Sequence, residues 1–207
     1  MNRILSIVFS GLFIIAVIGF IVMFKPNEPL SPEQIATEAT AKTYENSLHG
    51  FSLAYPEELN ILEYTPEIAT IGTLTEGGID GVVDIRVETI EGQPDESLTE
   101  AAARQLSLLC AADGPTQSFT CTGLKSAVPF VTISGTTGFK IFLHGELTDF
   151  TTGSVTEIDK GPYLAFVLST SATATKVLVI HPPLNQSAEE ANRESIESIA
   201  KTVRIRQ

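Results

Sequence analysis

Two side chains of the sequence have a spacing suited to acid–base chemistry, His144 and Glu146. Residues i and i+2 of a strand point to the same face, so an imidazole and a carboxyl group would stand together there and could exchange a proton. The same spacing is typical of a half-exposed strand face that carries polar residues, which is the interpretation we favour. The sequence therefore predicts no catalytic residues, and an enzyme that uses His144 and Glu146 is kept as an alternative.

Other chemistries lack their residue patterns. No Gly-x-Ser-x-Gly motif marks a serine nucleophile, and no glycine-rich loop leads into a helix that would hold phosphate. Asp80, Asp84 and Glu88 offer oxygen ligands to a hard cation, but Arg86 lies between the last two on the same strand face and favours a solvated, ion-paired surface. His49 and His181 flank predicted strands and are interpreted as polar residues at strand ends. We expect no metal and no cofactor.

The two cysteines, Cys110 and Cys121, are an even pair separated by ten residues. A disulfide between them would belong in an oxidising compartment, and closing a loop of this length stabilises a fold by roughly 3 kcal/mol. None of the three histidines lies at metal-ligand spacing from a cysteine. Because the spacing is not the Cys-x-x-Cys of redox motifs, we predict a structural disulfide, with two unrelated buried thiols as the alternative.

These residues follow a strongly apolar N-terminal segment. Residues 4–24 contain no charged side chain, and 21 helical residues span roughly 30 Å, the hydrocarbon thickness of a bilayer. A cleaved signal peptide has a shorter apolar stretch followed by a small-x-small site, and a core helix has a polar face. We therefore predict a transmembrane signal-anchor helix over 4–24 that lies in the lipid bilayer.

The flanks of this anchor predict its orientation. Arg3 and the chain terminus precede it, whereas the acidic residues begin at Glu28, and this bias favours a cytoplasmic location for residues 1–3. Residues 25–43 carry three prolines and alternate small with polar residues, which indicates a flexible tether. Residues 44–207 then form one extracytoplasmic domain, and the protein is expected in the cell membrane with a single pass.

The net charge excludes two classes of partner. The chain holds 13 Lys and Arg against 25 Asp and Glu, a formal net charge of −12. Arg3 is the only charged side chain before Lys25, so the rest of the chain carries −13. This is the wrong sign for binding nucleic acid or anionic lipid headgroups. We expect no nucleic-acid partner, and we expect the anchor to hold the protein at the membrane.

The domain alternates between strand and helix patterns. A helix is predicted over 97–110, because apolar residues recur there at helical spacing after a capping box that joins Ser97 to Glu100. A final helix is predicted from Ser187 to the chain end, with Arg204 and Arg206 at its negative pole. Alternating or continuous apolar runs predict strands within 51–63, near 68–74, and at 81–90, 128–133, 138–147, 153–158, 163–168 and 176–180.

This order predicts the α+β class, an antiparallel β-sheet covered by helices. The strands at 163–168 and 176–180 are apolar on both faces, so we expect them at the centre of the sheet. Pro182 and Pro183 follow the second of these strands and should end the sheet.

Several local motifs resemble the PsbP-like domains, a family that shares an αβα sandwich with the Ran-binding Mog proteins. The opening, Tyr44–Asn46 followed by Gly50–Pro56, is close to the family's tyrosine, short gap and "GFS-apolar-x-YP". Ile133–Gly135 resembles the family's mid-domain turn, and Glu194–Val203 its closing helix. The resemblance implies a PsbP-like αβα sandwich and a non-catalytic accessory role, often extracytoplasmic and tethered. It transfers no site residue, since members of the family bind different partners.

The sequence thus predicts a membrane-anchored protein whose extracytoplasmic, PsbP-like domain binds a protein or envelope partner of unknown identity. A pilin-like structural subunit is the alternative from another class, because such subunits also begin with an apolar helix before a β-rich domain. That class places an acid at the start of the apolar helix, whereas the first acid here is Glu28.

Overall fold

The computed structural model describes residues 41–92, 96–110, 112–113, 116–171, 173–184 and 191–206. The predicted anchor at 4–24 and the tether up to residue 40 lie outside the described residues. The first strand begins at Lys42, so the domain starts two residues earlier than predicted and takes in the end of the predicted tether. Among the described residues, no helix has the length and apolar character needed to cross a membrane.

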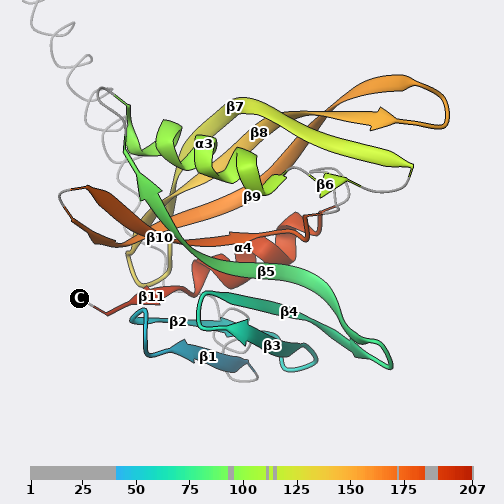
Figure 1. Ribbon diagram of the computed structural model, residues 1–207. Coiled ribbons are helices and arrows are strands. Elements are labelled where there is room, and N and C mark those ends of the chain that lie inside the picture. The colour runs from blue at the N-terminus through green and yellow to red at the C-terminus, as the bar shows by residue number, and fades with distance from the viewer. Residues whose placement is uncertain are drawn as a thin grey trace, which may run out of the picture. The chain divides into compact units, whose positions relative to one another are not determined.

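The described residues form two antiparallel sheets and two helices (Figure 1). The smaller sheet has the strand order β1-β2-β11, and the larger sheet has the order β3-β4-β5-β10-β9-β8-β7-β6. In chain order, the elements are β1 Lys42–Asn46, β2 Phe51–Tyr55, β3 Asn60–Thr65, β4 Ile68–Thr75, β5 Gly78–Glu91, α3 Leu98–Cys110, β6 Ala112–Asp113, β7 Gln117–Val131, β8 Thr137–Asp149, β9 Ser154–Thr170, β10 Ala174–His181, α4 Arg193–Lys201 and β11 Arg204–Ile205.

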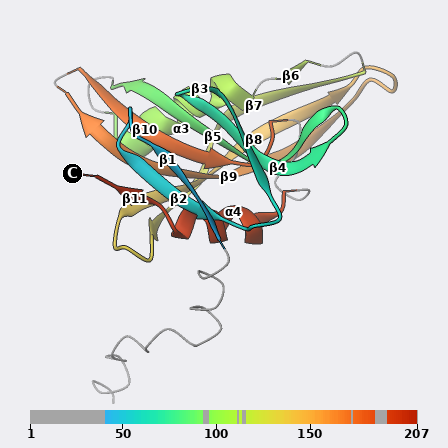
Figure 2. The ribbon, with the colours of Figure 1, turned by 90° about the horizontal axis from the view of Figure 1, so that it is seen from below.

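Both faces of the larger sheet are covered, as the views in Figures 1 and 2 show. Leu164 and Phe166 of β9 point into a core shared with α4 and the smaller sheet. Tyr163 and Ala165, which alternate with them, point into a second core under α3. A strand covered on both faces needs apolar residues at consecutive positions, and this confirms the predicted central place of β9 and β10. The predicted α+β class is also confirmed, with one addition: a small sheet lies beside α4.

Helix α3 has the capping box that the sequence predicts. The backbone N–H of Ser97 donates to the Glu100 carboxylate at 2.9 Å, and the backbone N–H of Glu100 donates to the Ser97 hydroxyl at 3.3 Å. Ala102 and Leu106 are buried against the sheet. The capping box therefore identified the start of this helix, and the period of 3.6 residues identified the face that packs.

The final helix differs from its prediction. It begins at Arg193, where the Asn192 side chain accepts from the backbone N–H of Ser195 at 3.1 Å, so Ser187 is not its cap. It ends at Lys201, because the Thr202 hydroxyl turns to the backbone of β2. The two terminal arginines therefore do not follow the helix axis, and the chain after it forms β11.

The long strands β7 and β9 also differ from their predictions. The runs predicted at 153–158 and 163–168 are one 17-residue strand, and β7 begins at Gln117 rather than near residue 128. Gly161, in the gap between the two predicted runs, lies in a bulge against β8. Gly161 has a φ of +124°, and a Cβ there would lie 2.9 Å from the carbonyl oxygen of Ile141, so only glycine fits the bulge.

Candidate functional site

The predicted cysteine pair is brought together. Cys110 and Cys121 stand at disulfide distance, with their Cα atoms 5.8 Å apart. Cys110 is the last residue of α3 and is buried, while Cys121 lies in β7 against the same core. A bond between them ties the end of the helix to the strand that follows, which agrees with a structural role.

The pair His144 and Glu146 does not face inward as a site. Across the β8–β9 ladder His144 lies opposite Asp159, and their side-chain atoms Nδ1 and Oδ1 are 3.6 Å apart. Lys125 donates to the same carboxylate, and Glu146 lies opposite Glu157. The His144 side chain is 56% exposed, so water screens these charges and the ion pair stabilises little. These positions agree with a solvated strand face.

A buried polar cluster lies on the α3 side of the sheet, where the sequence did not predict one. His181 was interpreted as a polar residue at a strand end, but its side chain is fully buried and packs on Tyr163 with ring centroids 5.5 Å apart. Its Nδ1 lies 2.6 Å from the carbonyl oxygen of Pro182, which only accepts, so this nitrogen carries the proton. The His181 Nε2 and the Arg86 Nε are buried without a hydrogen-bond partner in the described structure.

Arg86 belongs to the β5 row that was expected to be a solvated face. Asp84, in the same row, lies opposite His181, the last residue of β10. Burial raises the pKa of Glu88, against the lowering effects of Arg86 and of a hydrogen bond with Gln105 of α3. The row is therefore partly enclosed beneath α3. The sequence does contain a signal for the burial of His181. On a strand, side chains alternate between faces, so His181 shares its face with Val177 and Val179, which are both buried.

The electrostatics of this cluster keep its imidazole neutral. Burial lowers the pKa of His181 to about 4, with Asp84 raising it and Arg86 lowering it further. Burial also raises the pKa of Tyr163. Neither group gains or loses a proton readily near pH 7, so the cluster suits a structural role better than proton exchange.

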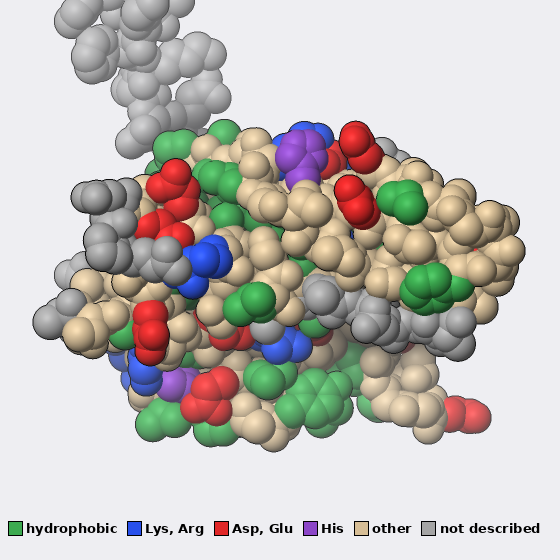
Figure 3. Space-filling view, turned by 45° about the horizontal axis from the view of Figure 1, so that its top comes forward, with side chains coloured by type: hydrophobic (Ala, Val, Ile, Leu, Met, Phe, Trp, Pro, Cys, Tyr) green, Lys and Arg blue, Asp and Glu red, His purple; other side chains and the backbone are tan. Residues whose placement is uncertain are grey.

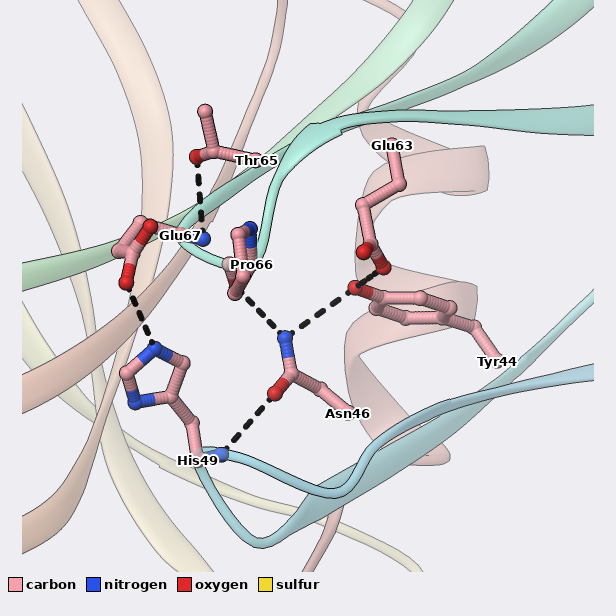
Figure 4. A network of polar contacts seen from close by, with 7 residues as sticks. All are labelled: Tyr44, Asn46, His49, Glu63, Thr65, Pro66 and Glu67. Carbon is pink, nitrogen blue, oxygen red and sulfur yellow. Dashed lines mark hydrogen bonds and ion pairs between the residues drawn. The ribbon is translucent and has the colours of Figure 1, made fainter.

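A second polar network joins the β1–β2 turn to the β3–β4 turn (Figure 4). The buried Asn46 amide donates to the Pro66 carbonyl at 2.6 Å and to the Tyr44 hydroxyl at 3.2 Å, and its oxygen accepts from the backbone N–H of His49 at 3.0 Å. The Tyr44 hydroxyl donates to Glu63 at 2.6 Å. Burial and this carboxylate raise the pKa of Tyr44 to about 12.

His49 completes this network, since its Nε2 lies 3.3 Å from the Glu67 carboxylate (Figure 4). The His49 side chain is only 6% exposed, although the sequence suggested a simple polar strand end. The hydrogen bond with His49 lowers the pKa of Glu67. Together these contacts hold the β3–β4 turn against the smaller sheet, and with it the outermost strand of the larger sheet.

A groove of about 600 Å³ lies at another edge of the domain. The β7–β8 turn, the end of β9 and strand β11 line it, with Val167 on one wall and Arg204 and Arg206 on the other. Arg206 forms an exposed ion pair with Glu45. The groove is therefore lined by both apolar and charged side chains and holds no candidate catalytic group.

On the face shown in Figure 3, acidic side chains stand singly or in small groups among polar and hydrophobic side chains. Within the described ranges, no three His, Cys, Asp or Glu side chains are grouped so that they could hold a metal ion.

No family model matches the chain, and no curated protein matches it. Among solved structures it is similar to cyanobacterial PsbP from Synechocystis sp. PCC 6803, at 12% identity and a TM-score of 0.40, over 88% of this chain and 100% of that one. It is also similar to a crystal structure from Bacteroides thetaiotaomicron VPI-5482, at 14% identity and a TM-score of 0.29, over 81% of this chain and 49% of that one.

Proposed function

We propose that this protein is anchored in the cell membrane by residues 4–24 and that its domain lies outside the cytoplasm as a PsbP-like, non-catalytic binding module. The observation that carries the location is the pair Cys110 and Cys121 at disulfide distance. A disulfide persists in oxidising compartments and is rare in the cytosol. The uncharged apolar segment supplies the means of attachment.

The PsbP-like part of the proposal is supported by the structural roles of the residues that carry the resemblance. Tyr44 is buried and takes part in the network of Figure 4, while Phe51, Leu53 and Tyr55 are buried in the core shared with α4. The opening motif therefore builds the smaller sheet and seats it on the larger one. A motif used in this way is tied to the fold, and it leaves the surface free to differ between members of a family.

The non-catalytic part is supported by where the candidate groups lie. His144 is solvated beside Asp159, and His181 is enclosed and neutral. A binding role needs instead a stable surface, which the network around Asn46 provides by fixing the β3–β4 turn.

Reporter fusions after Gln207 in a bacterial host test the location. We expect alkaline phosphatase, which needs its own disulfides, to be active there, and green fluorescent protein exported in the same way to stay dark. The matched control is the same pair of fusions without residues 4–24, which should reverse both results. An active cytoplasmic reporter on the intact chain would overturn the proposed topology.

A second measurement tests the absence of catalysis. If the purified chain shows a hydrolase or transferase activity that His144→Ala abolishes and Glu146→Gln reduces, the enzyme alternative is correct and the binding-module proposal is wrong. Activity that survives both substitutions would locate catalysis elsewhere and would also contradict the proposal.

A further inference from the structure

Within the residues that the structure describes, the outermost strand of the larger sheet, β3, has a hydrogen-bonded neighbour on one side only. A strand in this position presents unpaired N–H and C=O groups along its free edge, a template on which another extended chain can pair. The first four residues of β3 pair regularly with β4, and a bulge follows between Glu63 and Thr65. The regular stretch is therefore long enough for several main-chain hydrogen bonds.

The side chains of β3 divide between its two faces. Ile61 packs against the core, and Glu63 accepts from the Tyr44 hydroxyl of the smaller sheet. On the other face Leu62 is 40% exposed. Tyr64, 59% exposed, is the bulge residue that has no partner on β4, so the regular alternation of faces stops at it. The two side chains together leave apolar surface exposed beside the free edge.

Strand β7, near the opposite border of the larger sheet, carries more of the features that block pairing with another strand than β3 does. Strand β7 carries Lys125 and Pro129, and it has two bulges against β8. The short strand β6 covers part of its outer edge. Lysine, proline, bulges and covering segments are the features by which proteins block pairing at an edge. Among the two long borders of this sheet, β3 is the one that accepts a further strand more readily.

The charge around β3 selects the chemistry of that strand. Between Lys42 and Arg86 the chain has no Lys or Arg and eight Asp or Glu residues. Exposed members of this acidic set lie directly beside β3, at Glu57 and Glu58 before it and at Glu67 after it. A second copy of this acidic chain would be repelled here, whereas a basic segment would be attracted.

The β3 edge is also held in place before any partner arrives. The contacts of Asn46 and His49 fix the turn that follows β3 (Figure 4), and Lys42 donates to the Leu59 carbonyl at 2.8 Å just before it. A preordered edge loses little conformational entropy when a strand adds to it.

We propose that β3 is a docking edge for an extended, basic segment of a partner protein, with apolar residues at alternate positions that pack on Leu62 and Tyr64. The added strand pairs its main chain with β3, and its Lys or Arg side chains meet the acidic residues around it. This inference rests on the proposed binding function and names the chemistry of its partner.

The test measures fluorescence anisotropy of a labelled nine-residue peptide of alternating Lys and Val, added to the full-length chain in a non-ionic detergent. We expect saturable binding at 50 mM salt that weakens at least tenfold at 500 mM. A matched peptide of alternating Glu and Val, and a Lys–Val peptide N-methylated at alternate residues, should each bind at least tenfold more weakly. Equal binding of either control peptide would contradict the proposal.

Variants locate the site. Glu57→Lys with Glu58→Lys, and separately Tyr64→Lys, should weaken binding at least tenfold, while Val155→Lys, at an equally exposed apolar position on β9, should change it less than twofold. Circular dichroism of each variant checks that it is folded. In hydrogen exchange with mass spectrometry, the peptide should protect 60–65 and leave 117–131 unchanged. Protection of 117–131 alone would overturn the assignment.

Two further results distinguish a basic partner from a second copy of this chain, and the docking proposal from the proposed location. A dimer of the chain without peptide, cross-linked through Tyr64→Cys, would overturn the basic partner in favour of a second copy. The peptide assay does not depend on topology. Loss of peptide binding with correct reporter topology removes only this inference, whereas binding with a cytoplasmic reporter removes only the proposed location.

Discussion

Lowering the pH should destabilise the domain through His181. In the fold its imidazole is enclosed by Tyr163, Asp84, Arg86 and the Pro182 carbonyl, and burial lowers its pKa to about 4. In the unfolded chain the pKa is about 6.5, so below that pH the unfolded state takes up a proton that the folded state does not. The contribution is fully present above pH 6.5 and is lost as the pH falls towards 4.

The size of the effect follows from the two pKa values. The difference between about 6.5 and about 4, at about 1.4 kcal/mol for each pH unit, amounts to about 3 kcal/mol when the pH lies below both. Between pH 6.5 and 4.5 the expected loss from this one group is about 2 kcal/mol. That is a large part of the stability of an ordinary domain.

Urea unfolding of residues 41–207, which form one compact unit, measures this loss. The chain has no Trp, so far-UV circular dichroism is the suitable signal. Carboxylates also titrate below pH 5, and the comparison is therefore with His181→Gln, which cannot take up the proton. The wild-type domain should lose about 2 kcal/mol more than this variant between pH 6.5 and 4.5. The control His144→Gln changes an exposed histidine and should keep the wild-type slope.

The reasoning is refuted if His181→Gln and the wild-type domain lose stability in parallel over this pH range. That result would mean that His181 is protonated in the fold at pH 4.5, and hence that water or a rearranged Asp84 reaches its ring. If His181→Gln is less stable than the wild type at pH 7 but loses less stability as the pH falls, the result agrees with the argument. The dependence of stability on pH reports proton uptake, whereas the stability at pH 7 also reports packing.

Three other predictions concern stability. Serine at both Cys110 and Cys121 should lower the free energy of unfolding in urea by about 3 kcal/mol, and the intact chain taken from cells should resist thiol alkylation; equal melts or full alkylation would contradict the disulfide. Replacing Thr202 by Val removes the hydroxyl that accepts from the Ala54 N–H at 2.8 Å and whose one proton is shared between the Ile199 and Ala54 carbonyls, at 2.7 and 3.0 Å; this should cost about 1–3 kcal/mol, with the Ser variant near wild type in the same urea melt. Replacing Gly138 by Ala places a Cβ 2.5 Å from a β9 carbonyl oxygen and should lower the thermal midpoint by several degrees, whereas Gly77→Ala, with nothing within 4 Å, should not; equal midpoints would show that β9 can move aside.

The local patterns predicted most of the elements, because each depends on neighbours in the chain. The capping box of α3 and the alternating residues of β5 are examples. What the patterns missed depends on distant partners. The bulge at Gly161 continues β9 only because β8 lies opposite it, and Thr202 ends α4 only because β2 is within reach.

The candidate sites show the same division. The pairing of Cys110 with Cys121 was predicted because they are the only two cysteines and ten residues separate them, and the structure places them at disulfide distance. The burial of His181 did not follow, since a histidine before two prolines resembles a strand end until β5 and β9 are placed around it. Likewise, the edge position of β3 depends on the order of the strands, which no local pattern contains.

The pairing of β11 with β2 determines when the domain can finish folding. Thr202 bonds to Ala54 across 148 positions of the chain, and the backbone N–H of Arg206 donates to the Gly50 carbonyl at 2.8 Å. Contacts between such distant parts form late and slow the folding of a chain. The smaller sheet therefore cannot be completed before residues 204–205 are synthesised and, on the proposed topology, have passed through the membrane. Until then β2 pairs with β1 alone and the edge at Phe51 that β11 will cover is open, a state in which an incomplete domain is prone to aggregate.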